Sequence, residues 1–488
     1  MIKDSSLYEK LRAYAQEDYY PFHMPGHKRN PAFQSELLPF GYDITEIDGF
    51  DNLHHATGIL EKAQRRAADL YGAAQTLFSV NGSSAALLAA ISAATTAGGQ
   101  MLIARNCHKA VYHAAMLLNL RLAYVYPSNT CAHGSINGGI SAQELEAILQ
   151  KNKAIQAVLI TSPTYDGVVS DVRRIAEVVH SYNLPLILDE AHGAHFPFHS
   201  YFPEAGNTLG ADVVINSLHK TLPALTQTAL LHCNSERIAF SKIKKYMEIY
   251  QSTSPSYILM ASIDYCIQLL ETDGRELLER YVQRLENLRA GLQELTSIRL
   301  LGYDEVMQDP TVKEYDRSKL LFYPDGTTGK LYRDLLEQYH IQMEMVTPEY
   351  VLGITSLADT QQGYDRLTEA LTLLDRQQHP SGKRDVEKYH RNLSSPKVNC
   401  TIGAAMESET CRQKLKESSG CTAAEFLYLY PPGVPLLVPG EVIQNDLLEA
   451  IEYYKCNGFS LQGLQDKTNE FIEVLAVGSS KANASRNQ

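Results

Sequence analysis

The sequence predicts an α/β protein built on a mostly parallel β-sheet that helices cover on both faces. Three observations support this class. Between residues 75 and 220, apolar β-branched runs alternate with segments of helical spacing. These runs are apolar throughout, as in strands buried on both faces, which is typical of parallel sheets. The length of 488 residues adds an expectation of two or three domains.

The first part of the chain precedes this regular alternation. Residues 4–17 have the apolar spacing of an amphipathic helix. Two irregular stretches follow, at residues 21–30 and 41–58, and the prolines and glycine of the first exclude regular structure. Helical spacing returns at residues 59–71, and Gly72 ends that helix.

From residue 75 on, strands and helices alternate regularly. The expected strands are residues 76–80, 101–105, 122–127, 157–163, 184–193 and 211–217, and the expected helices between them are residues 85–95, 108–119, 141–150 and 172–183. Each strand feeds a turn and then a helix, which is the pattern of repeated β-α-β units.

The rest of the chain contains further parts. After one more strand at residues 228–233, long helices run from about residue 235 to residue 293, with a break at 252–257. Alternating strands and helices then suggest a small α+β domain, and a polar stretch with two prolines suggests a linker. We therefore expect a large domain with its N-terminal segment at residues 1–294, the small domain at 295–376, the linker at 377–398 and a C-terminal domain at 399–488.

Composition excludes several classes of protein. Lys and Arg total 44 against 56 Asp and Glu, a net charge of −12, which argues against a nucleic-acid-binding protein. The 8 cysteines show no CxxC pair or zinc-ligand spacing, so they are expected as free thiols of a reducing compartment. The polar N-terminus lacks an apolar leader, and no apolar run reaches the length of a membrane span. We expect a soluble cytoplasmic protein that does not bind membranes.

A lysine stands where the chemistry of an open α/β sheet is usually found. Lys220 comes shortly after the buried run 213–215, beyond Ser217 and His219. Such sheets place their active sites in the crevice at the carboxyl ends of the strands. An amine at this position can form a Schiff base, and the neighbouring hydroxyl and imidazole can hold an anionic phosphate.

Other strand ends carry complementary groups. Gly82, Ser83 and Ser84 form a turn that begins a helix, and a helix N-terminus offers free N–H groups to a phosphate. His108 follows a second strand, where an imidazole can stack on an aromatic ring or move protons. Asp189 ends a fully apolar strand, so its carboxylate needs a partner, and a pyridinium N–H would be one.

Together these groups predict a binding site for pyridoxal 5'-phosphate. Lys220 lies 31 residues after Asp189, one strand–helix interval on. In a parallel sheet both project from the same edge as Ser83, Ser84 and His108. A phosphate cup, a histidine, a buried acid and a lysine are the parts that this cofactor requires.

Two other interpretations of the aspartate block are weaker. The letters DEAH also occur in helicases, but the sequence has no Walker A pattern to hold a nucleotide. His192 and His195 have a metal-ligand spacing but lack a third ligand, so no metal site is predicted.

The same residues lie in longer blocks that resemble the signature blocks of the Orn/Lys/Arg decarboxylase family. These blocks are FHMPGHK, NGSS, RNCHK, SPTYDG, DEAHGAH, SLHK, STSPSY and YPPGVPLLVPGE, and they cover nearly the whole chain. The chain looks like the short bacterial form, without the N-terminal receiver-like domain. The resemblance implies a fold type I enzyme that decarboxylates arginine, lysine or ornithine to a polyamine-pathway amine and carbon dioxide, acting as a homodimer or higher homo-oligomer with its sites at the interface.

The resemblance also implies roles for single residues. Lys220 is the Schiff-base lysine, Asp189 pairs with the pyridine nitrogen, His108 stacks on the ring, and His192 lies beside the cofactor. The phosphate is held by Ser83, Ser84, Ser217 and His219. Thr253 or Ser254 is expected to reach the phosphate bound by the partner subunit.

Some questions stay open at this point. TLPALTQT follows the lysine where many family members have small, Gly-rich residues, which leaves the substrate undecided. The carboxylate that meets the substrate's distal cation is also undecided, with Asp166, Glu46, Asp48 and Glu441 as candidates. Another fold type I reaction, an aminotransferase or aldolase, and a non-catalytic cofactor-binding relative remain alternatives.

Overall fold

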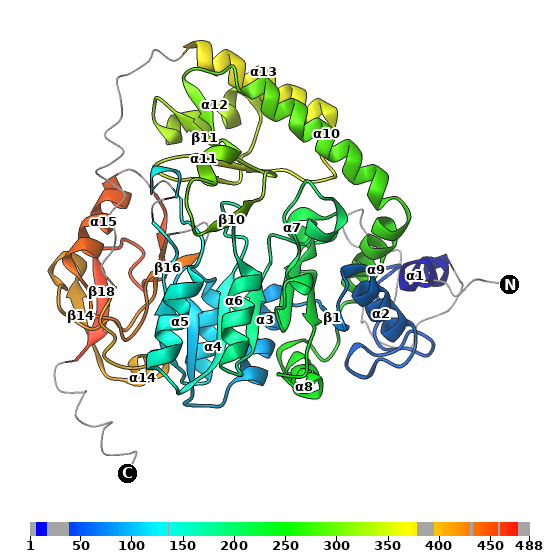
Figure 1. The fold of residues 1–488 in the computed structure, drawn as a ribbon, viewed down its shortest axis with the longest axis horizontal. Coiled ribbons are helices and arrows are strands. Elements are labelled where there is room, and N and C mark those ends of the chain that lie inside the picture. The colour runs from blue at the N-terminus through cyan, green and yellow to red at the C-terminus, as the bar shows by residue number, and fades with distance from the viewer. Residues whose placement is uncertain are drawn as a thin grey trace. The chain divides into compact units, whose positions relative to one another are not determined.

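The computed structural model describes residues 6–16, 39–129, 131–134, 136–377, 395–429, 433–456 and 459–476. The chain forms two compact units, and each is built from several separate segments. Figure 1 labels helices and strands of both units. Unit 1 contains Met1–Ala94, Val172–Leu285 and Thr355–Asp359, and unit 2 contains Thr95–Asp171, Glu286–Ile354 and Thr360–Gln488.

The strands of unit 1 bring three carboxyl ends to one edge. They are ordered β1 (Gln75–Ser79), β8 (Ala229–Cys233), β7 (Val213–Ser217) and β6 (Leu186–Asp189). β6 and β7 are parallel, with Asp189 opposite Ile215, whereas β8 is antiparallel to both β7 and β1. Ser79 and Ser217 are both paired with Ala229. The last residues of β1, β7 and β6 therefore lie at the same edge of the sheet.

Unit 1 also contains helices. They are α1 (Leu7–Gln16), α2 (Ile59–Tyr71), α3 (Gly82–Ala94), α6 (Val172–Ser181), α7 (Leu218–Thr221), α8 (Phe240–Tyr250), α9 (Tyr257–Thr272) and α10 (Gly274–Leu292), the last of which continues into unit 2. Of these, α2, α3, α6 and α7 contact the strands of unit 1. Helix α3 consists mostly of buried small residues, so it packs closely on β7, β8 and α8. Gly72 ends α2 in the left-handed conformation, with φ +65°, as the sequence predicted.

Unit 2 contains a second set of parallel strands. β4 (Ile155–Thr161), β2 (Gln100–Ala104) and β3 (Arg121–Val125) are adjacent in that order, and both pairings are parallel. Helices α4 (Lys109–Leu117) and α5 (Ala142–Lys151) follow β2 and β3 in the chain. The short β5 (Val168–Ser170) pairs with β10 (Val312–Tyr315) in a separate ribbon.

The remainder of unit 2 is antiparallel. Its four-stranded sheet has the order β12 (Met345–Val346), β13 (Val351–Ile354), β11 (Lys319–Pro324) and β9 (Ile298–Leu300), accompanied by α11 (Tyr303–Val306), α12 (Thr328–Tyr339) and α13 (Gln361–Gln377). The C-terminal part contains α14 (Ile402–Glu407), β14 (Thr410–Lys414), β15 (Leu427–Leu429), β16 (Val434–Leu437), α15 (Asn445–Cys456), β17 (Leu461–Gln462) and β18 (Phe471–Leu475). It has its own hydrophobic core, which includes Leu427, Ile443 and Ile472.

These elements agree with the predicted alternation of strands and helices. The predicted loop at residues 21–30 and most of the predicted linker at 377–398 lie outside the described residues. Among the helices that the structure describes, none combines the length and the apolar character needed to cross a bilayer.

Candidate active site

The turn after β1 forms the first corner of the site. Gly82 has a φ of +72°, a conformation that favours glycine, and its N–H donates to the carbonyl of Gln227 at 2.9 Å. The Ser79 hydroxyl donates to the Gly82 carbonyl at 2.8 Å. These contacts fix the start of α3, whose first N–H groups have no carbonyl partner within the helix.

Two serines from distant parts of the chain meet at this corner. The hydroxyl oxygens of Ser83, in the first turn of α3, and Ser217, the last residue of β7, are 2.6 Å apart. Ser84 is the next residue of the same turn and is exposed. Hydroxyls beside a helix N-terminus form a site suited to an anion such as a phosphate.

The short helix α7 carries the lysine. Lys220 Nζ lies 3.0 Å from His192 Nε2, although His192 lies in the turn after β6 and Lys220 in the helix after β7. His219 Nδ1 lies 2.9 Å from the Thr228 carbonyl, and because a carbonyl only accepts, Nδ1 carries a proton there. Burial and the charge of Lys220 lower the pKa of His219, which the Thr228 carbonyl offsets in part.

Asp189 provides the acid of the site. Its side chain is buried at the end of β6, and its carboxylate accepts a hydrogen bond from the Ala191 N–H at 3.2 Å. Burial raises the pKa of Asp189, and the positive charge of Lys220 offsets part of that rise. A protonated pyridine nitrogen would supply the cation that a buried carboxylate needs. The acid, the lysine and the serine corner therefore fit pyridoxal phosphate.

His108 belongs to unit 2, unlike the other predicted site residues. It follows β2 and caps α4, because its Nδ1 accepts the Ala110 N–H at 3.2 Å. Its stacking on a cofactor ring stays a prediction. In the described residues, no group of three or more His, Cys, Asp or Glu side chains is arranged to hold a metal ion.

Sequence reasoning missed Glu190, which is buried directly after Asp189. Its carboxylate accepts hydrogen bonds from the Gly206 N–H at 2.8 Å and from Asn216 Nδ2 at 3.1 Å. Burial raises the pKa of Glu190 to about 8, the Asn216 and Gly206 hydrogen bonds lower it in part, and Asp189 raises it further. An acidic doublet at the end of an apolar strand was the available signal, since two adjacent carboxyls are seldom buried without a specific role.

This raised pKa predicts how stability depends on pH. Between its ordinary pKa of 4.5 and the folded value of about 8, Glu190 is protonated in the folded chain and ionised in the unfolded chain. The free energy of unfolding therefore falls as pH rises through that window, by up to about 1.4 kcal/mol per pH unit from this group. We expect Glu190→Gln to lack this pH dependence. The measurement is the free energy of urea unfolding of wild type minus that of Glu190→Gln, which should fall between pH 5 and pH 8. Parallel curves for the two proteins would contradict the assignment.

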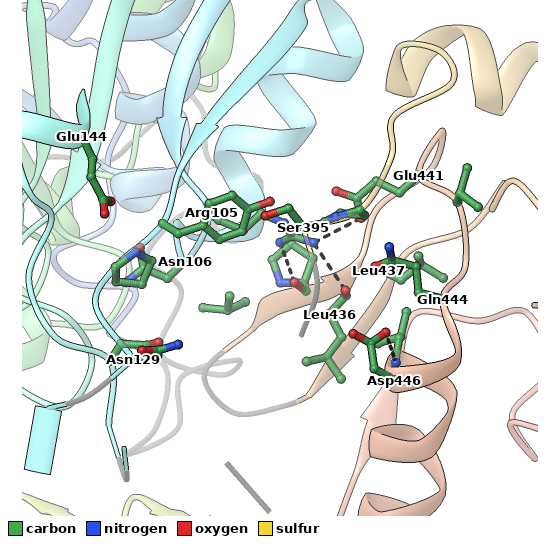
Figure 2. Close-up of a pocket in the computed structure, with 18 residues that line it drawn as sticks. Arg105, Asn106, Asn129, Glu144, Ser395, Leu436, Leu437, Glu441, Gln444 and Asp446 are labelled. Carbon is green, nitrogen blue, oxygen red and sulfur yellow. Dashed lines mark hydrogen bonds and ion pairs between the residues drawn. The ribbon is translucent and has the colours of Figure 1, made fainter. Parts of the chain in front are cut away.

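Unit 2 contains a pocket of about 560 Å³ beside a buried ion pair (Figure 2). Arg105 follows β2, and its Nη2 lies 3.2 Å from Glu441 Oε2, with side chains 11% and 1% exposed. Arg105 also donates to the carbonyls of Pro435 at 2.7 Å and Leu436 at 3.4 Å. The dashed lines of Figure 2 show these contacts. One guanidinium thus holds residues 435–441 of the C-terminal segment against the end of β2.

The structure separates the four candidate partners of a distal cation. Asp166 is buried and accepts the Tyr350 hydroxyl, and Asp48 is exposed. Glu46 has one buried carboxylate oxygen, Oε1, without a partner among the described residues. Burial raises the pKa of Glu441, and Arg105, the Val438 N–H and the Tyr124 hydroxyl offset part of that rise.

Comparison with known proteins gives the family. The model of the Orn/Lys/Arg decarboxylase major domain matches residues 5–361, and that of the C-terminal domain matches residues 389–462. The arginine decarboxylase of Bacillus subtilis (strain 168) is 31% identical over 484 residues, which is 97% of this chain and 98% of that protein. An arginine decarboxylase of Halalkalibacterium halodurans is also 31% identical, over 97% of this chain and 98% of its own length.

Solved structures agree in fold. The Francisella novicida lysine decarboxylase has a TM-score of 0.82 at 19% identity, over 96% of this chain and 81% of that one. The constitutive lysine decarboxylase of E. coli has a TM-score of 0.79 at 21% identity, over 96% of this chain and 82% of that one. These likenesses confirm the predicted fold class, fold type I. The chain therefore belongs to the Orn/Lys/Arg decarboxylase family and, as its motifs predicted, is an amino-acid decarboxylase.

Proposed function

We propose that this chain uses pyridoxal 5'-phosphate to remove the α-carboxylate of a basic amino acid, giving carbon dioxide and a polyamine-pathway amine. The observation that supports the proposal best is the grouping of Lys220, His192 and Asp189 at one sheet edge. Lys220 lies 3.0 Å from His192 and acts electrostatically on the buried Asp189. The Ser83–Ser217 corner, beyond the carboxyl ends of β1 and β7 on either side of β8, supplies the place for a phosphate.

Each residue then has a defined task. Lys220 would hold the cofactor covalently and exchange a proton with His192. Asp189 would hold a proton at the pyridine nitrogen. Ser83, Ser84, Ser217 and His219 would bind the phosphate, and His108 would stack on the ring. The cofactor, when bound, accepts the electron pair released as carbon dioxide leaves.

Arginine is the substrate that we propose first. Proteins called arginine decarboxylase match almost the full length of this chain at 29–31% identity, whereas a lysine decarboxylase of E. coli matches at 24%. The test is a parallel assay of carbon dioxide and amine from arginine, lysine and ornithine. We expect the highest kcat/KM with arginine. Turnover of amino acids without carbon dioxide release would instead favour an aminotransferase or aldolase.

Replacing Asp189 with Asn should leave the cofactor bound but lower kcat by roughly 100-fold or more, because the ring nitrogen loses the carboxylate that keeps it protonated. The absorbance of the bound cofactor measures occupancy, and stopped assays of carbon dioxide measure kcat. Full activity in the occupied variant would remove Asp189 from the proposed site.

We also infer that the chain forms a homodimer or higher homo-oligomer in the cytoplasm. Within each chain we propose a large domain at residues 1–294, a small domain at 295–376, a linker at 377–398 and a C-terminal domain at 399–488. All eight cysteines are free, which supports a reducing compartment. Thr253 and Ser254 are exposed in the loop between α8 and α9, and they could reach a partner's phosphate. Light scattering tests the assembly, and a monomer that is fully active would exclude shared sites.

A further inference from the structure

We propose that Glu190 is a positioning residue, whose side chain and backbone carbonyl fix the turn at residues 190–193 so that His192 stays against Lys220. This inference rests on the proposed role of Lys220. Glu190 itself touches neither the lysine nor the predicted cofactor site, because both carboxylate oxygens are directed to Gly206 and Asn216.

Glu190 joins three segments of unit 1. Its N–H donates to the Ile215 carbonyl at 3.0 Å, which extends the pairing of β6 with β7 by one residue. Its carbonyl accepts the Gly193 N–H at 2.9 Å and Asn216 Nδ2 at 2.9 Å. The first of these two hydrogen bonds closes the turn that carries His192, and the second ties that turn to β7.

The orientation of Asn216 depends on Glu190. Its Nδ2 donates to both the carbonyl and the carboxylate of Glu190, whereas its Oδ1 is buried and has no partner among the described residues. Leaving a buried acceptor unpaired costs about 1–3 kcal/mol. Rotating the amide would direct Oδ1 at the backbone carbonyl oxygen of Glu190, which cannot donate, so Glu190 fixes the arrangement despite that cost.

Two glycines allow the backbone to approach Glu190. A Cβ on Gly206 would lie 2.2 Å from Leu188 Cδ2 and 3.2 Å from Glu190 Oε1. A Cβ on Gly193 would lie 2.6 Å from Glu190 Cγ. The turn is therefore packed on both sides of the Glu190 side chain, and it has little room for an alternative conformation.

The same turn contacts both Asp189 and Lys220. Its Ala191 N–H donates to the Asp189 carboxylate at 3.2 Å, and its His192 ring lies 3.0 Å from Lys220. A displacement of about 1 Å in an active site can cost about 100-fold in rate. Loosening the turn should therefore lower turnover more than substrate binding.

The test compares Glu190→Ala, Glu190→Gln and Asn216→Ala in the full-length chain. We expect kcat to fall about 100-fold in Glu190→Ala, with a smaller change in KM. Glu190→Gln should lie between it and wild type, because its amide oxygen still accepts one hydrogen bond while its NH2 group faces the second N–H donor. Glu177→Gln, on the exposed face of α6, is the matched control and should leave kcat unchanged.

A second readout does not depend on the cofactor. In the chain freed of cofactor, the pH profile for labelling of Lys220 by an amine-reactive reagent reports its contact with His192, read by peptide mass spectrometry. We expect this profile to shift in Glu190→Ala and Asn216→Ala but not in Glu177→Gln. If the chain had no decarboxylase activity, the proposed function would fail while the labelling shift could still appear.

An unchanged kcat together with an unchanged labelling profile, in variants that melt like the wild type, would overturn the positioning role. Should Glu190→Ala fail to fold, Asn216→Ala decides the question, because it removes the same tie between the turn and β7 while keeping the acid. If Asn216→Ala lost stability but kept the wild-type kcat and labelling profile, the proposal would also be overturned, because Glu190 would then have only a structural role.

Discussion

Replacing Lys220 with alanine is expected to lower decarboxylation by roughly 10⁴-fold or more and to abolish the covalent adduct that borohydride traps. The expectation follows from position, since this amine follows the end of β7 and lies 3.0 Å from His192. The methyl side chain of alanine has no amine that could hold the cofactor covalently. In other enzymes, removing a covalent catalytic group lowers the rate by up to about 10⁶-fold.

Peptide mapping after borohydride treatment measures the adduct, and amine production measures turnover. Lys245→Ala is the matched control, because Lys245 is an exposed lysine on α8 and is not one of the predicted site residues. It should keep both the adduct and the rate. A trapped adduct on another lysine of Lys220→Ala would refute the assignment of the nucleophile.

The sequence allowed the site edge to be predicted because parallel strands share a direction. Asp189 ends a fully apolar run and Ser217 lies two residues beyond the apolar run 213–215, and the structure places them on adjacent parallel strands. The position of Ser83 does not follow from a pair of adjacent parallel strands. Its strand, β1, reaches the same edge only through β8, which is antiparallel to both neighbours. An apolar run indicates a strand but not its direction, so periodicity alone could not give this arrangement.

Other features depend on contacts between residues distant in the chain. The partners of Glu190 come from β7 and from the segment at Gly206, and nothing in the DEAH letters specifies them. Arg105 and Glu441 are separated by 336 residues, although each lies in a block that the sequence singled out. Each unit also combines segments that are separated in the sequence, and the order of elements along the chain does not predict this combination.

The pairing of Arg105 with Glu441 leads to the largest expected effect on stability. Both side chains are almost fully buried, so removing one leaves the other as an unpaired buried charge. We expect Glu441→Ala to lower the free energy of unfolding by about 3–5 kcal/mol. It also removes the acceptor of the Val438 N–H, at 2.9 Å. Urea denaturation followed by circular dichroism measures the change.

A double-mutant cycle separates the charge from the packing. Arg105→Met and Glu441→Met each leave a buried charge uncompensated, whereas the double variant leaves none, so it should be less destabilised than the sum of the two single variants. Part of the loss should persist in the double variant, because it still lacks the Arg105 guanidinium that donates to the carbonyls of Pro435 and Leu436. Glu177→Ala, which breaks an exposed pair with Arg174, should have little effect. Strictly additive losses at Arg105 and Glu441 would mean that the guanidinium stabilises the C-terminal segment through its backbone contacts alone, and that the carboxylate is held near it without energetic coupling.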